Sequence, residues 1–180
     1  MQANHTARSR EDDEVMLRLR PPRISDEAAV LTSQRELAAE DFVFAFLRPG
    51  QSFVEYVQSV EDHRHGRSID RGWVESTWLV ADVEGSVVGR SSVRFDLNDY
   101  LLAEGGHIGY AVRPGYRRRG YATEILRQSL VVARAGGVQD VLVTCDDDNV
   151  GSVRAIEANG GILENVVEID GVPLRRYWIS

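Results

Sequence analysis

An alternation of apolar and polar residues opens the patterned part of the chain. Val15, Leu17 and Leu19 alternate with polar and basic residues, which predicts a short half-buried strand that ends at two prolines. Residues 1–14 are polar, charged and without periodicity, and we interpret them as a disordered N-terminal tail. The folded domain is therefore expected over residues 15–180.

Helical spacing follows this strand. Residues 25–27, Ser-Asp-Glu, have the acceptor and acidic side chains of a helix start, and apolar residues follow them. Farther on, residues 52–65 place apolar side chains at Phe53, Val57 and Val60, as one face of an amphipathic helix does. The pattern therefore predicts two helices after the first strand.

The period changes back to that of strands in the middle of the chain. Residues 73–83 and 87–95 predict two strands, and Glu84-Gly85 between them is a tight hairpin signal. Residues 96–105 predict an irregular loop. Residues 106–112 then have the apolar and aromatic content of a buried strand.

The remaining pattern predicts a helix, a strand, a helix and a hairpin. A helix is expected from Tyr121 to about residue 135, because apolar residues recur on one face and two glycines follow. Residues 138–145 are apolar on both faces, which is typical of an interior strand. Residues 146–149, Asp-Asp-Asp-Asn, predict the start of the next helix, and 162–179 predict a hairpin around Asp-Gly.

The order of elements is thus β-α-α-β-β-β-α-β-α-β-β. It predicts an α/β fold of the α+β kind, a mixed sheet with helices on its faces. The length of 180 residues suits one domain with a proper core.

Composition and charge narrow the class of protein. The net charge of -7 argues against a nucleic-acid-binding domain, and no apolar run approaches a membrane span. The single cysteine, Cys145, excludes an intramolecular disulfide and fits a reducing compartment. His63 and His65 have no second ligand cluster, so no metal site is expected. We therefore expect a cytoplasmic protein without nucleic-acid or membrane partners.

A basic, glycine-containing turn lies between the strand at 106–112 and the helix at Tyr121. Pro114-Gly115 ends the strand, and Arg117 to Arg119 and Gly120 follow. The first turn of a helix leaves N–H groups unpaired, so this arrangement suits an anion such as a phosphate. A solvated basic loop is the simpler alternative, but strand, glycine and helix together favour anion binding.

This turn also carries a family fingerprint: Arg or Gln, any two residues, Gly, any residue, then Gly or Ala. Arg117, Gly120 and Ala122 match it. Asn149 with Ser152, and the Asn-Gly-Gly at 159–161, fall in register with the same family. The chain resembles the GNAT superfamily of N-acetyltransferases over roughly residues 15–180, and within it an uncharacterised bacterial group.

The resemblance implies direct transfer of an acetyl group from acetyl-CoA to a primary amine of a small molecule or peptide. It implies that N–H groups of the arginine turn hold the CoA pyrophosphate and that the strand before it pairs with the pantetheine arm. An N–H of that strand would polarise the thioester carbonyl. The residues implied in cofactor binding are Tyr110, Ala111, Val112, Arg117, Arg118, Arg119, Gly120, Tyr121, Ala122, Thr123, Asn149 and Ser152.

Three residues are candidates for catalysis. Glu104 lies where several relatives place their base, counting back from Gly120, and His107 is the other ionisable group near the proposed thioester. For His107 a structural role is the stronger alternative. Asn149 is implied near the acetyl group, and it is equally suited to be a helix N-cap.

One position departs from the family. Many members carry a tyrosine seven residues after the asparagine, as general acid for the thiolate, and here that residue is Ile156. Tyr110 and Tyr100 are the substitutes considered. The departure leaves a second hypothesis open, a non-catalytic acyl-CoA-binding sensor or regulatory domain.

The acceptor and the oligomeric state, a homodimer included, are left open by the sequence. Acidic residues in the regions expected to choose the acceptor favour a cationic one, although solubility also produces acidic surface. These residues are Asp41, Glu55, Glu61, Asp62, Asp96, Asp99 and Glu104.

Overall fold

The computed structural model describes residues 16–67, 69 and 71–180. The predicted tail at 1–14 and Val15 lie outside the described residues. The strands are β1 (Arg18–Arg20), β2 (Ser76–Val83), β3 (Ser86–Arg94), β4 (Ile108–Val112), β5 (Val141–Asp146), β6 (Ile162–Ile169) and β7 (Val172–Ile179). The α-helices are α1 (Glu27–Ala38), α2 (Phe53–Arg64), α3 (Tyr121–Ala135) and α4 (Val150–Ala158). This order matches the predicted one.

The strands form two antiparallel sheets, with the orders β1-β2-β3-β4 and β5-β7-β6. The α+β fold class is confirmed, but the single mixed sheet expected from the sequence is divided between β4 and β5. The physical reason is the pairing of β5: it bonds along its whole length to the C-terminal strand β7. Its other edge does not continue the ladder of β4.

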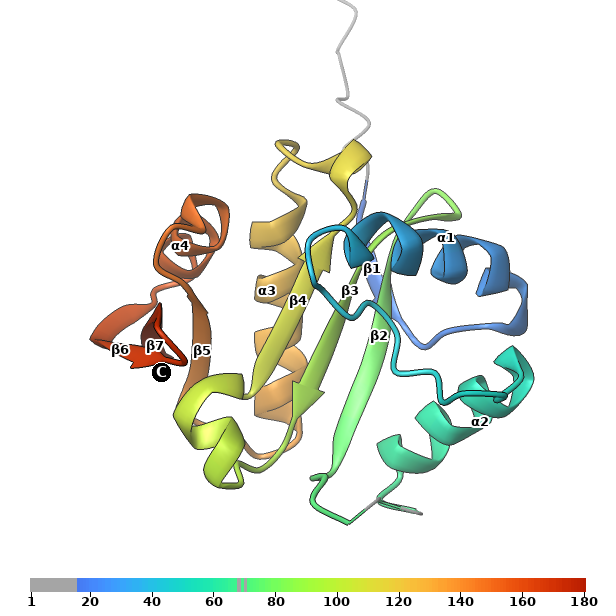
Figure 1. The fold of residues 1–180 in the computed structure, drawn as a ribbon, viewed down its shortest axis with the longest axis horizontal. Coiled ribbons are helices and arrows are strands. Elements are labelled where there is room, and N and C mark those ends of the chain that lie inside the picture. Colours follow the sequence, from blue (N-terminus) through green and yellow to red (C-terminus); the bar gives the residue numbers. More distant parts are fainter. Residues whose placement is uncertain (1–15, 68, 70) are drawn as a thin grey trace, which may run out of the picture.

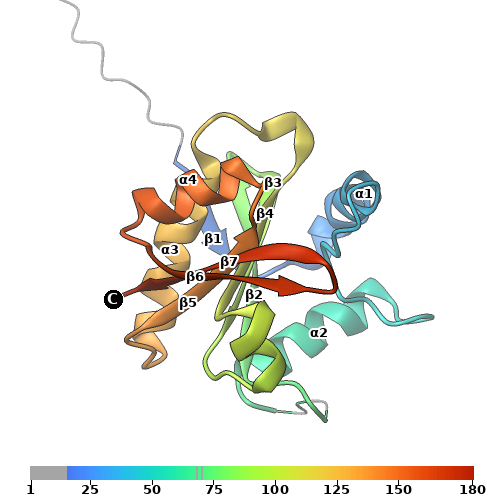
Figure 2. The ribbon, with the colours of Figure 1, turned by 60° about the vertical axis from the view of Figure 1, so that its left-hand side comes forward.

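Helices cover both faces of the four-stranded sheet. Trp78 and Val80 pack in one cluster with side chains of α1 and α2, while the alternate residue Ala81 packs with Ile125 of α3. Because side chains alternate between the faces of a strand, α3 lies on the face opposite α1 and α2. Figure 2 shows this sheet between α3 on one side and α1 and α2 on the other.

The two sheets meet at the start of β4. The His107 N–H donates to the Leu142 carbonyl at 2.8 Å, and the Leu142 N–H donates to His107 Nδ1 at 2.9 Å. Gly106 has φ 61° and ψ -178°, and a Cβ there would lie 2.7 Å from the Leu142 oxygen. The backbone and side chain of His107 thus join β4 to β5 at this end, where Gly106 allows the close approach, and Figure 1 shows the two strands diverging from it.

Residues 96–105 are more regular than the predicted irregular loop. Leu101–Gly105 form one π-helical turn, closed by the Gly106 N–H on the Leu101 carbonyl at 2.7 Å. Arg94 stabilises this turn by donating from Nη1 to the Gly105 carbonyl at 3.2 Å. The turn depends on a side chain from β3 and on burial of Leu101, which local periodicity does not encode.

The two predicted hairpins are confirmed at Glu84-Gly85 and Asp170-Gly171. All four residues have positive φ, between 49° and 83°. Two successive residues with positive φ match the right-handed twist of the flanking strands.

Candidate functional site

A cleft of about 680 Å³ opens where β4 and β5 diverge. Its walls come from β4, the turn before α3, the first turn of α3, the start of α4, and the end of α1 with the segment after it. Of the residues implied in cofactor binding, those that line it are Tyr110, Ala111, Val112, Arg117, Arg118, Gly120, Tyr121, Ala122, Thr123, Asn149 and Ser152. Arg119 is not among the lining residues.

The first turn of α3 presents unpaired backbone donors to this cleft. The Glu124 N–H donates to the Gly120 carbonyl at 3.2 Å and is the first amide of α3 to reach a carbonyl four residues back. The N–H groups of Tyr121, Ala122 and Thr123 therefore have no acceptor within the helix. Gly120 precedes them with φ 78°, and an added Cβ would meet nothing within 4 Å. The helix dipole adds positive potential at this end, so the turn suits an anion.

The three arginines of the turn have different roles. Arg117 donates from Nη1 and Nη2 to the Glu40 carboxylate at 2.9 and 2.6 Å, and from Nε to the Val112 carbonyl at 3.1 Å. These bonds fasten the turn to β4 and to the end of α1, and the bond from Arg117 lowers the pKa of Glu40. Arg119 lies over the Tyr116 ring at 5.7 Å, whereas Arg118, with φ 66°, lines the cleft.

Asn149 is the N-cap of α4. Its Oδ1 accepts from the Ser152 N–H at 3.1 Å, so the capping alternative considered for this residue is confirmed. The cap uses the amide oxygen and leaves the NH₂ group as a separate donor. Because Asn149 also lines the cleft, capping and a place beside a bound ligand are compatible.

The Tyr110 side chain is buried in the wall of the cleft. Its hydroxyl is buried and makes no hydrogen bond of good geometry among the described residues, although the Ser152 side chain lies close to it. Burial raises the pKa of Tyr110 to about 12, and the neighbouring Ser152 side chain opposes the rise. The hydroxyl is therefore a protonated donor over the pH range in which proteins work.

Glu104 and His107 do not line the cleft. The His107 side chain joins the two sheets through Nδ1 and lies edge-on to the Trp178 ring at 6.5 Å. Burial lowers the pKa of His107, so the imidazole is neutral. Glu104 sits in the π-helical turn, where its carbonyl accepts from Thr144 Oγ1 at 2.6 Å.

The position of the family tyrosine lies in the core. Ile156 is fully buried in the cluster that contains Leu126 and Val143, and it does not line the cleft. Cys145 belongs to the same cluster, and burial raises the pKa of its thiol to about 11. The thiol therefore stays protonated, as a small buried hydrophobe rather than a nucleophile.

The structure adds lining residues that sequence reasoning missed. Arg154 contributes a cation from α4, and Leu37 and Phe42 contribute apolar surface from the opposite wall. Phe42 lies in an irregular segment with no periodic signal. Arg154 follows the N-cap Asn149 by five residues in α4, and that position could have pointed to it.

Two antiparallel sheets that part beside the first turn of a helix define an acetyltransferase fold. The model of the acetyltransferase (GNAT) domain family matches residues 16–162, and the chain belongs to this family. The resemblance stated from the arginine turn is thereby confirmed.

Solved structures share the fold at low sequence identity. An N-acetyltransferase from Staphylococcus aureus Mu50 is 17% identical with a TM-score of 0.65, covering 92% of this chain and 98% of its own. YncA from Salmonella typhimurium, solved with its cofactor acetyl-CoA, is 16% identical with a TM-score of 0.63, covering 91% and 93%. RimJ from Mycobacterium smegmatis, in complex with CoA-disulfide, is 20% identical with a TM-score of 0.64, covering 91% and 81%.

No curated protein sequence matches the chain. Within residues 16–67, 69 and 71–180, no helix is long and apolar enough to cross a membrane. In the same part of the chain, no cluster of three or more His, Cys, Asp or Glu side chains could hold a metal ion.

Proposed function

We propose that this protein transfers an acetyl group from acetyl-CoA directly to a primary amine of a small molecule or peptide. The observation that carries the proposal is the first turn of α3, where three unpaired N–H groups follow Gly120 and face a cleft beside β4. These donors suit the diphosphate of CoA. Membership of the acetyltransferase family supports the reaction.

We assign a role in cofactor binding to two walls of the cleft. The N–H groups from Arg118 to Thr123 hold the diphosphate, and the backbone of residues 110–112 pairs with the pantetheine arm. An N–H of this strand polarises the thioester carbonyl as negative charge develops on its oxygen. The amine nitrogen forms a bond to the carbonyl carbon, the carbon–sulfur bond breaks, and the amine proton passes to a base or to water.

Tyr110 is the group we assign to the leaving thiolate. Its side chain lines the cleft and its buried hydroxyl lies beside Ser152, whereas Tyr100 is 61% exposed and does not line this cleft. Ile156, at the position of the family tyrosine, is buried in the core and cannot replace it.

Tyr110→Phe is expected to lower kcat about 100-fold or more, because it removes the proposed proton donor. The pKa of Tyr110, raised to about 12, keeps the phenol protonated between pH 7 and 10, so the wild-type rate shows no descending limb from this group there. Steady-state kinetics on both proteins across that pH range measure both effects. If Tyr110→Phe kept the wild-type kcat and Tyr100→Phe lowered it, Tyr100 would be the proton donor instead.

Thiol release in a screen of primary amines with acetyl-CoA tests the reaction itself. Glu104→Gln and Asn149→Ala are included, because Glu104 remains the proposed base and Asn149 the proposed neighbour of the acetyl group. Unchanged rates in both variants would remove these two assignments and leave the proposed cofactor site standing. Absence of acetyl-CoA binding would overturn the proposed function.

The alternative is an acyl-CoA-binding sensor. It is favoured by one observation, that neither Glu104 nor His107 lines the cleft. Amine-dependent CoA release rules it out, and tight acetyl-CoA binding without release from any amine supports it. A cytoplasmic location stays part of the proposal, supported by the free thiol of Cys145. The proposal fixes no oligomeric state, and a homodimer is compatible with it.

A further inference from the structure

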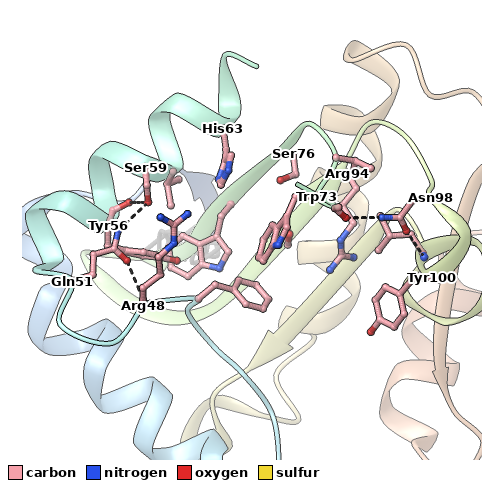
Figure 3. A pocket seen from close by; sticks show the side chains of 17 residues that line it. Arg48, Gln51, Tyr56, Ser59, His63, Trp73, Ser76, Arg94, Asn98 and Tyr100 are labelled. Carbon is pink, nitrogen blue, oxygen red and sulfur yellow. Dashed lines mark hydrogen bonds between the residues drawn. The ribbon is translucent and has the colours of Figure 1, made fainter. Parts of the chain in front are cut away.

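A second cavity of about 400 Å³ lies on the α2 side of the four-stranded sheet. It is enclosed by α2, the start of β2, the end of β3 and the residues around 98–101. Figure 3 shows His63 entering it from α2, Trp73 from the segment before β2, and Arg94 from the end of β3. It is rich in aromatic lining residues: Phe46, Tyr56, Trp73, Trp78 and Tyr100.

The charged side chains that line this cavity are cationic. Arg48 and Arg94 line it, while no Asp or Glu of the described residues does. Arg94 donates from Nη1 to the carbonyls of Gly105 and Gly106, at 3.2 and 3.3 Å, and its charge has no carboxylate partner in the described chain. His63 Nε2 is also buried there without a hydrogen-bond partner among the described residues, with its ring stacked on Trp73 at 6.0 Å.

A second arginine lies between this cavity and the cofactor cleft. Arg90 is 3% exposed and donates to the carbonyls of Gly109 and Val43, at 3.1 and 2.9 Å. Its guanidinium lies 4.7 Å from the Phe42 ring and 5.7 Å from the Phe46 ring. Phe42 lines the cofactor cleft and Phe46 lines the second cavity, so Arg90 fills the wall between them.

The two cavities approach each other at β4. A Cβ on Gly109 would lie 3.5 Å from Nη1 of Arg94 and 3.8 Å from Nη1 of Arg90. Ala111, two residues along the same face, lines the cofactor cleft beside the proposed thioester. A molecule in the second cavity therefore lies next to the strand on which acetyl transfer is proposed.

We propose that the second cavity binds the acceptor and selects an amine that carries a flat apolar body and a carboxylate, with Arg94 as the partner of the carboxylate. This inference rests on the proposed acetyl transfer. The aromatic side chains bury the apolar body, and a guanidinium without a carboxylate partner favours a bound anion. The acidic residues that suggested a cationic acceptor do not line the cavity.

Arg90, although it is buried, strengthens the preference of the cavity for a carboxylate. A guanidinium buried among carbonyls and rings, with its Nε unpaired in the described chain, adds positive potential beneath Gly109. Burial, together with the nearby Arg94, lowers the pKa of Arg90 to about 9. An anion in the adjacent cavity would relieve the repulsion between the two arginines.

Matched pairs of amines test this proposal by catalysis. 4-(Aminomethyl)benzoate is compared with benzylamine, and L-phenylalanine with phenethylamine, using thiol release from acetyl-CoA. Of the two amines that carry a carboxylate, the better substrate is expected to exceed its neutral counterpart about 10- to 100-fold in kcat/KM. This is the effect of one charge-assisted hydrogen bond, about 10- to 100-fold in affinity. Arg94→Gln should remove this ratio, Arg94→Lys should keep part of it, and Arg127→Gln, on the exposed face of α3, should leave it unchanged.

A binding measurement separates this inference from the proposed function. Tryptophan fluorescence, sensitive to Trp73 and Trp78, follows titration with N-acetyl-L-phenylalanine and with its neutral amide. Tighter binding of the anion that disappears in Arg94→Gln, while acetyl-CoA affinity stays unchanged and circular dichroism shows a folded protein, supports the acceptor site. Equal or tighter binding of the neutral compound, or a preference that survives Arg94→Gln, overturns it. Absence of acetyl-CoA binding in the wild type would refute the transferase proposal, and with it the role of the cavity as an acceptor site, while its preference for the anion would still be measured.

Discussion

Gly120→Glu is expected to weaken acetyl-CoA binding about 100-fold or more while the fold is retained. The new carboxylate would lie at the start of α3, accept from the N–H groups of the first turn and add negative charge where the diphosphate is proposed to bind. Each lost hydrogen bond to a charged ligand weakens binding by about 1.5–3 kcal/mol. The fold should persist because an added Cβ meets nothing within 4 Å.

Isothermal titration with acetyl-CoA measures this effect, and Gly120→Gln is the matched control. Glutamine has nearly the same size and bears the same cost of a positive φ, 78° at this residue, but it brings no charge. Gly120→Gln should therefore bind acetyl-CoA more tightly than Gly120→Glu. Wild-type affinity in Gly120→Glu, with circular dichroism showing a folded protein, would place the cofactor elsewhere.

Gly106→Ala is expected to lower the free energy of unfolding by about 2–5 kcal/mol. The backbone at φ 61° and ψ -178° belongs to a region that only glycine adopts readily, at a cost of about 1–3 kcal/mol for other residues. The new Cβ would also lie 2.7 Å from the Leu142 carbonyl oxygen, an atom of the backbone. Relieving that contact would separate β4 from β5 where the His107 bonds join them.

Urea denaturation followed by circular dichroism measures the loss, with Gly115→Ala as its control. A Cβ on Gly115 meets nothing within 4 Å and its φ is not positive, so its change should stay within about 0.5 kcal/mol. Because the junction also sets the opening of the cleft, a Gly106→Ala protein that folds should bind acetyl-CoA more weakly. Equal stability of the two variants would contradict the proposed role of the junction.

Local signals predicted those parts of the protein that depend on near neighbours. Asp170-Gly171 and Glu84-Gly85 predicted hairpins because two residues decide the turn. Asn149 predicted a helix start because a cap needs only the N–H groups two or three residues on. Gly120 and the apolar spacing after it predicted the start of α3 for the same reason, and the anion site proposed there stays a prediction.

Long-range packing decided the features that were missed or differed. The division of the sheet follows from pairing between β5 and the C-terminal β7, and the π-helical turn follows from Arg94 on β3. Neither partner is a neighbour in sequence. Glu104 and His107, close in sequence to the proposed thioester strand, lie outside the cleft because the π-turn and the junction hold them there.

By itself the sequence determined the family, the order of elements and the helix start at Tyr121 that leaves backbone N–H groups unpaired, since each depends on residues within one or two turns of each other. Only the tertiary structure decided where the charges of β3 lie. In the sequence Arg90 and Arg94 are polar residues of a predicted strand, without a motif. Packing of the segment after α1, 47 residues from Arg90, buries that guanidinium against Val43, and a cavity lined by Arg94 results beside it. Such contacts arise from the way whole elements pack, and no local pattern encodes them.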